Sequence, residues 1–125
     1  MPEFDYVEDE PIIPVTLQNG ENSLFLNFFV DTGADITIIP LSFAKLLGFD
    51  TWEDDEIENA QGAGGGTIPY FVRKVVIFID NKEFEVEIAC SLHDDIPFLL
   101  GRKGIFDKFR VCFDDREKKV TFTEL

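Results

Sequence analysis

The stretch FLNFFVDTGADITII, residues 25–39, places an acidic turn between two apolar segments of strand composition. Phe, Leu, Val and Ile dominate both flanks, as they do in buried strands. A carboxylate at Asp31 is unexpected if one strand simply continues, and it requires a turn, a solvent-facing cleft or a partner. Gly33 permits backbone geometry that a side chain would block, and the Thr32 hydroxyl can bond main-chain groups. We therefore expect a turn that presents Asp31 for chemistry.

The segments around this turn predict an all-β domain with one or two short helices. They are short, rich in β-branched and aromatic residues, and separated by turn signals such as Asn19-Gly20. Residues 41–47 have helical spacing and stop at Gly48, and residues 102–108 have room for one or two helical turns. Strands are expected at residues 12–17, 23–30, 36–39, 57–60, 68–79, 84–89, 98–100, 111–113 and 120–122.

Length and composition favour a single domain that covers residues 1–125. The 125 residues, 45% of them hydrophobic, can build a core but leave little room for a second domain. A chain of this size buries a modest share of its surface, so association into a dimer would help it. The first ten residues, MPEFDYVEDE, are polar and acidic, and we expect residues 1–10 to be flexible.

A glycine-rich segment, QGAGGGT at residues 61–67, lies between two further segments of strand composition. Glycine lets a backbone approach a ligand closely and lets a hairpin open. The pattern predicts a long hairpin with a glycine tip.

The formal net charge of −14 narrows the range of partners. Phosphate binding needs clustered Lys and Arg, so nucleic acid and anionic membrane surfaces are disfavoured. The N-terminus lacks the apolar run of a signal peptide, and no segment approaches the roughly 20 apolar residues of a membrane span. Cys90 and Cys112 are too few for a disulfide framework and are expected to be reduced. The expected location is cytoplasmic.

Carboxylates gather at residues 50–58 and at Asp94-Asp95, so cation binding has to be weighed. The spacing lacks the central Gly and terminal Glu of a calcium loop, which favours a solvated acidic loop. His93 stands near Ser91, but no nucleophile-elbow motif and no zinc-ligand frame surround it. We expect no metal and no cofactor.

Asp31-Thr32-Gly33, followed by Ala34-Asp35 and preceded by an apolar strand, resembles the catalytic motif of retroviral-type (retropepsin-like) aspartic proteases. The glycine-rich hairpin lies where that family has its flap. Residues 98–102 (FLLGR) look like its apolar-apolar-Gly segment, and residues 109–122 (FRVCFDDREKKVTF) look like the terminal strands of its cellular and prokaryotic members. The resemblance covers residues 12–122 and implies a retropepsin-like acid-protease barrel.

Only one Asp-Thr-Gly occurs in the chain, whereas pepsin-like enzymes carry two in a chain of more than twice this length. The resemblance therefore implies a single lobe that forms a two-fold homodimer, with Asp31 from each subunit. Such a carboxylate pair holds one proton, activates a water and hydrolyses a peptide bond, as in aspartic proteases generally. The expected activity is that of an aspartic endopeptidase acting on a polypeptide.

The resemblance also assigns roles to the neighbours of Asp31. Thr32 and Gly33 are expected to support the dyad, and Asp35 is expected to form a structural ion pair with Arg102 that supports the dimer. Ala34 lacks the hydroxyl that some members offer the dyad, so we expect a mildly acidic pH optimum rather than one below about pH 3. Expected substrate-binding residues are Ala34, Asp35, Gly62, Ala63, Gly64, Gly65 and Gly66, beside apolar pockets fed by Ile36, Ile68, Phe71 and Phe98.

Two other functions remain open from the residues. One is a non-catalytic dimeric peptide-binding module on the same fold, since fold alone does not establish activity. The other is an acidic β-barrel that binds cations through residues 50–58 or Asp94-Asp95. The intact Asp-Thr-Gly favours the protease, because a pure binder has no need of an uncompensated carboxylate pair.

Overall fold

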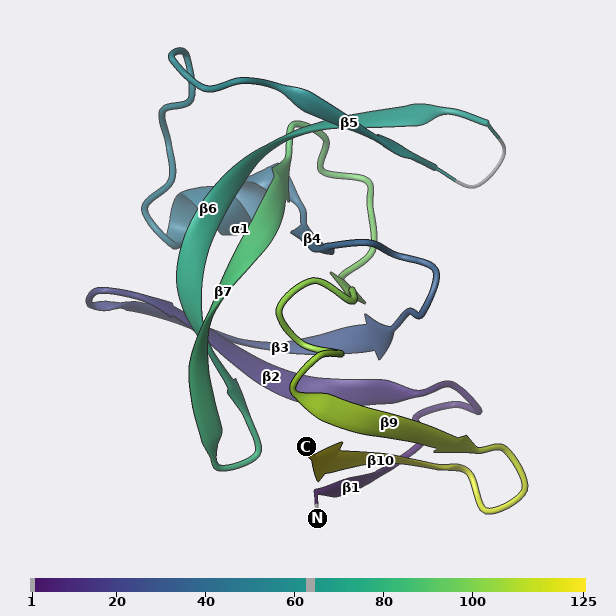
Figure 1. Cartoon of the computed structure of the whole chain (residues 1–125). Coiled ribbons are helices and arrows are strands. Elements are labelled where there is room, and N and C mark those ends of the chain that lie inside the picture. Colours follow the sequence, from purple (N-terminus) through teal and green to yellow (C-terminus); the bar gives the residue numbers. More distant parts are fainter. Residues whose placement is uncertain (1, 63–64) are drawn as a thin grey trace.

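The computed structural model describes residues 2–62 and 65–125, and in these residues the chain is almost entirely β-structure (Figure 1). A seven-stranded sheet has the order β2-β3-β8-β4-β7-β6-β5 and is closed by a further pairing of β2 with β6. A three-stranded sheet has the order β1-β10-β9. The elements are β1 Glu3–Asp5, β2 Ile12–Asn19, β3 Asn22–Val30, β4 Thr37–Ile39, α1 Leu41–Leu46, β5 Glu58–Gln61, β6 Thr67–Ile79, β7 Lys82–Ser91, β8 Leu99–Leu100, β9 Phe109–Asp114 and β10 Lys119–Glu124.

Alternating apolar residues drive the first hairpin, β2–β3. Ile13, Val15 and Leu17 are fully or almost fully buried, while their neighbours along β2 are only half-buried. The two strands pair from Ile12 with Phe29 to Asn19 with Asn22, and Gly20 makes the turn at φ +58°. That backbone conformation suits glycine, as the Asn-Gly signal predicted.

One apolar core fills the space between the strands. Its largest fully buried side chains include Phe28, Phe71 and Phe122, which come from β3, β6 and β10. Phe122 contacts Phe109 edge to face, with ring centroids 5.6 Å apart. The three-stranded sheet thus packs into the same core as the larger one. The predicted all-β fold with short helical content is confirmed, and its helix is α1.

Residues 2–10 contain a paired strand and a turn, so the expectation of a flexible segment at residues 1–10 is wrong for its described part. Strand β1 pairs antiparallel with β10, and the Phe4 ring packs edge to face against Phe122 with centroids 6.0 Å apart. The Tyr6 hydroxyl donates to Asp115 Oδ1 at 2.9 Å. Two aromatic side chains, Phe4 and Tyr6, together with the pairing to β10, hold this short acidic segment in place.

Residues 102–108 form consecutive turns rather than the expected helical turns of a second helix. The amides of Ile105 and Phe106 both donate to the carbonyl of Arg102. Gly104 has φ +74°, a left-handed conformation that interrupts a right-handed helix. A glycine that looked neutral in the sequence therefore breaks the segment.

Within the described residues, no helix has the length and apolar character needed to traverse a bilayer.

Candidate active site

Asp31 opens the loop between β3 and β4, and its own main chain and side chain fix the turn. The Asp31 amide donates to the carbonyl of Leu100 at 3.0 Å, and its Oδ1 accepts the Gly33 amide at 2.9 Å. The Ala34 amide donates to the Asp31 carbonyl at 3.2 Å. Asp31 is half-buried, whereas Thr32 and Gly33 are exposed. The carboxylate is thus held in one orientation at the surface of a single chain.

A close main-chain crossing supports this loop from behind. A Cβ on Gly101 would lie 2.4 Å from the Ile36 carbonyl carbon, so no side chain fits at that position. The Gly101 amide donates to Oγ1 of the buried Thr37 at 3.0 Å. The crossing explains why glycine follows the apolar pair of β8, and it places Arg102 next to the Asp31 loop.

The segment after Gly101 fastens the loop through its amides. The Arg102 amide donates to the Ala34 carbonyl at 3.0 Å, and the Lys103 amide donates to the Asp35 carbonyl at 2.9 Å. The Arg102 guanidinium also forms an ion pair with the Asp35 carboxylate. Their side chains are 54% and 86% exposed, so in one chain this is a surface pair rather than a buried one.

Strands β5 and β6 form a long hairpin that projects beyond the barrel (Figure 1). Gln61 pairs with Thr67, the Gly62 amide donates to the Gly66 carbonyl at 2.7 Å, and Gly65 has φ +88°. Ala63 and Gly64, two of the expected substrate-binding residues, lie outside the described residues. The hairpin predicted from the glycine-rich segment has the expected strand pairing on both sides.

An ion pair over aromatic rings anchors the base of this hairpin, and sequence reasoning missed it. Arg73 contacts both carboxylate oxygens of Asp55, with Nη1–Oδ2 2.6 Å and Nη2–Oδ1 2.8 Å. Its guanidinium lies 4.7 Å from the ring centroid of Phe71, on which Trp52 stacks at 5.1 Å. The hydrogen bond from Arg73 holds the pKa of Asp55 below its usual value. The acidic loop at residues 50–58 is therefore attached to β6 at Asp55 rather than wholly solvated.

Tyr70, on β6 of the hairpin, is a further candidate site residue, and the sequence analysis did not single it out. It is half-buried and pairs with Glu58 on β5 and with Ser91 on β7. Desolvation raises the pKa of the Tyr70 hydroxyl and the nearby Glu58 charge raises it further, whereas the Lys103 charge lowers it and the Asp35 charge raises it more weakly. Tyr70 therefore lies within electrostatic reach of the loop that carries Asp31.

The apolar side chains expected to line substrate pockets differ in burial and fall into two groups. Ile36 and Ile68 are half-buried and border the Asp31 loop and the hairpin. Phe71 is fully buried under Trp52, so its expected role in a pocket is wrong. Phe98 packs edge to face on Phe28 and Phe43 and belongs largely to the core.

The loop at residues 91–97 has a structural role in the described chain. The Asp94 Oδ1 accepts the Ser42 amide at 2.7 Å, and this main-chain hydrogen bond lowers the pKa of Asp94. The exposed His93 donates its amide to Ser91 Oγ. Among the described residues, no group of three or more His, Cys, Asp or Glu side chains is placed to hold a metal ion.

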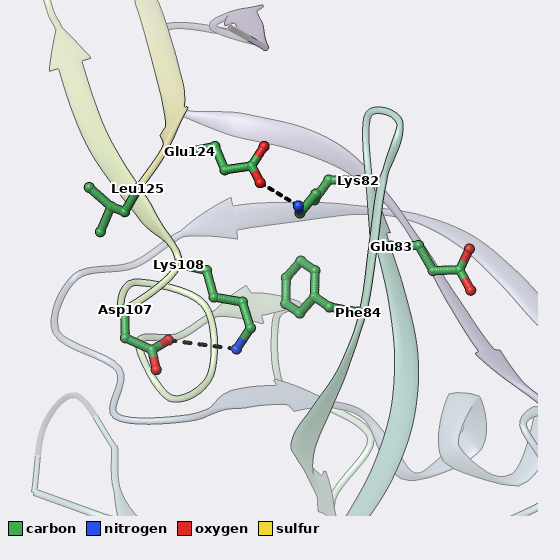
Figure 2. Close-up of a pocket in the computed structure, with 7 residues that line it drawn as sticks. All are labelled: Lys82, Glu83, Phe84, Asp107, Lys108, Glu124 and Leu125. Carbon is green, nitrogen blue, oxygen red and sulfur yellow. Dashed lines mark hydrogen bonds and ion pairs between the residues drawn. The ribbon is translucent and has the colours of Figure 1, made fainter.

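A pocket of about 380 Å³ lies at the β6–β7 turn and the C-terminus (Figure 2), and no residue of the Asp31 loop lines it. Two ion pairs lie within its lining: Lys82 with Glu124, and Lys108 with Asp107 (Figure 2). A more open depression of about 600 Å³ includes the ion pair of Lys103 with Glu87. Neither contains a residue expected to take part in catalysis.

The sequence profile of the family described as aspartyl protease matches residues 13–103 of this chain. The chain belongs to the aspartyl protease family. The matched range runs from β2 past Arg102, so it includes the Asp31 loop, the hairpin and the Gly101 crossing. Strands β1, β9 and β10 lie outside it.

Solved structures of retropepsin-like proteases share the fold. A retropepsin-like aspartic protease from Rickettsia conorii is 22% identical, with a TM-score of 0.70 over 96% of this chain and 98% of that one. The EIAV protease, in complex with the inhibitor HBY-793, is 23% identical, with a TM-score of 0.62 over 81% of this chain and 89% of that one. No curated protein matches the chain. The retropepsin-like fold of this aspartyl protease family member, expected from the Asp-Thr-Gly motif, is confirmed.

Proposed function

We propose that the chain is a homodimeric aspartic endopeptidase whose catalytic dyad consists of Asp31 from each subunit. The observation that carries the proposal is the way Asp31 is held: Gly33 orients its carboxylate at the surface of a braced loop. The next carboxylate along the chain, Asp35, is engaged by Arg102. With a single Asp-Thr-Gly in the sequence, the second carboxylate of a dyad has to come from a second copy.

The chemistry needs no cofactor. Two carboxylates a few ångströms apart cannot both ionise easily, so the pair keeps one proton, as in aspartic proteases generally. The ionised Asp31 takes a proton from a water molecule, and that water attacks the peptide carbonyl carbon. The protonated Asp31 donates to the carbonyl oxygen, which gives a tetrahedral species with two hydroxyl groups. The Asp31 that took the proton from water then passes it to the amide nitrogen, the C–N bond breaks and the amine leaves, while one hydroxyl returns its proton to the other Asp31. The pair titrates as one unit.

The substrate class we propose is an extended polypeptide held between the Asp31 loops and the β5–β6 hairpins. An extended peptide can form strand-like hydrogen bonds with both. The carbonyl of Gly33 and the exposed glycines of the hairpin, Gly65 and Gly66, offer main-chain groups without steric obstruction. Ile36 and Ile68 would supply apolar contacts to its side chains.

The test is digestion of an unbiased peptide mixture from pH 3 to 7, read by mass spectrometry. The wild type is compared with Asp31→Asn and with Asp80→Asn. Asp80→Asn is a matched control because it removes the same charge in the β6–β7 turn, where Asn tolerates the φ of +55°. Cuts made by the wild type and by Asp80→Asn but lost in Asp31→Asn support the proposal.

Mixing wild type with Asp31→Asn tests the shared dyad. If one site needs two Asp31 residues, an equal mixture of exchanging subunits keeps about a quarter of the activity, rather than about half. Retention of half would exclude a shared site. If a protein shown to be dimeric makes no cuts at any pH, the non-catalytic peptide-binding module becomes the better reading of the same fold.

A further inference from the structure

Strand β7 has an open edge over its first half. On one side its residues pair with β6 from Lys82 to Ser91. On the other side β4 pairs only with Ile88, Ala89 and Cys90, and no other strand of the described chain extends that ladder. The edge of β7 over residues 82–87 therefore has no strand beside it.

The main-chain groups of alternate residues point out of this edge. The Leu92 amide, just beyond β7, donates to the Pro69 carbonyl of β6 at 2.9 Å. Direction alternates along a strand, so the even-numbered residues of β7 bond to β6. The N–H and C=O groups of Glu83, Glu85 and Glu87 accordingly face away from β6. Within the part of the chain that the structure describes, no main-chain hydrogen bond from a loop or turn reaches them.

The side chains of the same three residues form a row of carboxylates. Residues two apart on a strand point to one face, so Glu83, Glu85 and Glu87 lie on the face opposite to Phe84 and Val86. Figure 2 shows Glu83 and Phe84 on opposite sides of the strand. Glu87 forms an exposed ion pair with Lys103 at 2.8 Å. The ion pairs between described residues include neither Glu83 nor Glu85, which are both exposed.

Two depressions lie one after the other along this edge. Residues 82–84 of β7 line the pocket of about 380 Å³, and residues 85–87 line the more open depression of about 600 Å³. Asp107 lines both, so the two adjoin. An added strand lies about 4.8 Å from its neighbour and needs open space of this kind beside it.

We propose that this edge is an exosite, a second binding site for the polypeptide substrate, that takes an extended basic segment as an additional strand. Antiparallel pairing would place alternate substrate residues opposite Glu83, Glu85 and Glu87, with about six main-chain hydrogen bonds. Lys or Arg at these alternate positions would lie beside the three carboxylates. The inference rests on the proposed peptidase function and names a class of substrate for it.

The charges on the edge select its occupant. Charged side chains commonly protect an open strand edge against pairing with other copies. A second copy of this edge would place Glu opposite Glu, and like charges directly opposite each other are destabilising. A basic strand would be attracted instead, and the net charge of −14 favours its approach.

The exosite begins at the Asp31 loop, which favours a substrate over an unrelated partner. Strand β4 starts opposite Ile88, one residue beyond the open edge, and the chain just before β4 is the Asp31 loop. In that loop the Asp35 carbonyl accepts the amide of Lys103, a residue that also lines the larger depression. A polypeptide that leaves the Asp31 site beside Asp35 therefore meets the open edge of β7 next.

The first test is an NMR titration with the blocked peptide Lys-Thr-Lys-Thr-Lys. The isotope-labelled protein carries Asp31→Asn, so that it lacks the proposed catalytic carboxylate. We expect the amide signals of Glu83, Glu85 and Glu87 to shift. No shift at millimolar peptide would overturn the proposal.

Two methylated peptides separate strand addition from attraction by charge. N-methylation of the lysines blocks the amides that face β7 and should weaken binding by more than about tenfold. N-methylation of the threonines leaves those amides intact and should change the affinity by less than about threefold. Equal losses for the two peptides would show that no strand is added.

Glu83→Gln/Glu85→Gln tests the carboxylates, which lie outside the Asp31 site. The double substitution should raise the Kd of the peptide by about fivefold, because two opposite-charge pairs are lost. The matched control, Glu21→Gln/Glu117→Gln, removes the same charge from two exposed turns and should leave the Kd within about twofold. An equal rise in both would assign the binding to net charge and overturn the exosite.

Kinetics test whether the bound segment belongs to the substrate. A peptide cut by the wild type is extended at either end with a flexible Gly-Ser linker and Lys-Thr-Lys-Thr-Lys. The extension should lower KM by about tenfold with kcat nearly unchanged, since binding at the edge raises the effective concentration of the cleavage sequence. Glu83→Gln/Glu85→Gln should lose this gain and cut the short peptide as the wild type does. A KM that the extension does not change would overturn the exosite.

The two proposals fail in different ways. Binding at Glu83, Glu85 and Glu87 by a protein that cuts no peptide would refute only the proposed activity. Proteolysis without binding at this edge would refute only the exosite.

Discussion

Arg73 and Asp55 join the acidic loop to strand β6 through two parallel contacts of 2.6 and 2.8 Å. The same guanidinium donates to the carbonyls of Val72 and Thr51 at 2.8 and 2.9 Å. Thr51 and Asp55 lie in the acidic loop before β5, and Val72 lies on β6 just beyond the residues that pair with β5. A planar guanidinium that donates to four acceptors is well suited to fix the angle at which the β5–β6 hairpin leaves the barrel.

The ion pair should make stability depend on pH. Arg73 lowers the pKa of Asp55 in the folded chain, so the unfolded chain takes up the proton first. The stabilisation is present above the ordinary carboxyl pKa of about 4 and is lost as pH falls through the folded value. We expect the melting temperature to fall below about pH 4, and to fall less steeply in Asp55→Asn than in the wild type.

Circular dichroism melts from pH 3 to 7 measure this effect. Asp54→Asn is the matched control, because it removes an exposed carboxylate one residue away. Its melting curve should keep the acid sensitivity of the wild type. Parallel behaviour of Asp55→Asn and the wild type at every pH would show that the pair contributes nothing to acid sensitivity.

Arg73→Lys separates the effect of the positive charge from that of the planar guanidinium group. Lysine keeps the positive charge but cannot meet both oxygens of Asp55 and two carbonyls at once. We expect a loss of about 1–3 kcal/mol in the free energy of unfolding, from denaturant titration. Amide exchange should also speed up in Glu58–Gln61 before it does in β2. Unchanged exchange in β5 would mean that the hairpin does not depend on Arg73.

The close main-chain crossing at Gly101 predicts that a side chain at this position disrupts the fold. A Cβ at residue 101 would lie 2.4–2.8 Å from main-chain atoms of Ile36, which cannot move without displacing the Asp31 loop. Gly101→Ala should cost about 3 kcal/mol or more, and the variant is expected to be poorly folded. Gly66→Ala is the control, since a Cβ there meets nothing within 4 Å. Similar unfolding midpoints in urea for the two variants would contradict the crossing.

The N-terminal strand should contribute to the stability of the fold. Phe4→Ala removes the edge-to-face contact with Phe122, which should cost about 1–3 kcal/mol of unfolding free energy. Urea titration measures the loss, and an unfolding free energy equal to that of the wild type would show that the Phe4 ring adds nothing to the core.

Sequence reasoning predicted the elements whose signals are local. Alternating apolar residues located β2 and β3, and Asn19-Gly20 located their turn, because both signals lie within a few residues. The glycines at residues 62–66 indicated the hairpin for the same reason. At Gly101 the sequence pattern marked the position, but only the structure shows the cause, which is contact with Ile36.

Contacts between distant residues were missed. Asp55 and Arg73 are 18 residues apart, and nothing in either neighbourhood marks them as partners. Strand β1 has three residues, too few for a periodic pattern, and pairs with a strand more than a hundred residues later. Residues 102–108 have helical composition, yet Gly104 is held at φ +74° with a Cβ position 2.9 Å from Val86 Cγ2. Tertiary packing overrides local preference there.

The ion pair of Asp35 with Arg102 offers a final prediction, because its contribution to stability should differ between monomer and dimer. In one chain both side chains are more than half exposed, and surface pairs contribute about 0–1 kcal/mol. The amides of Arg102 and Lys103 brace the loop by themselves. Arg102→Met should therefore barely change the unfolding free energy of a chain kept monomeric by dilution. If the second copy covers the pair, the same substitution leaves the Asp35 carboxylate without its partner at the interface. The dimer dissociation constant should then rise markedly. Urea titration of the dilute monomer and sedimentation velocity of the dimer measure the two effects. A large loss in the monomer would show that Arg102 stabilises the loop within its own subunit, and an unaffected dimer would show that the pair stays solvated after assembly.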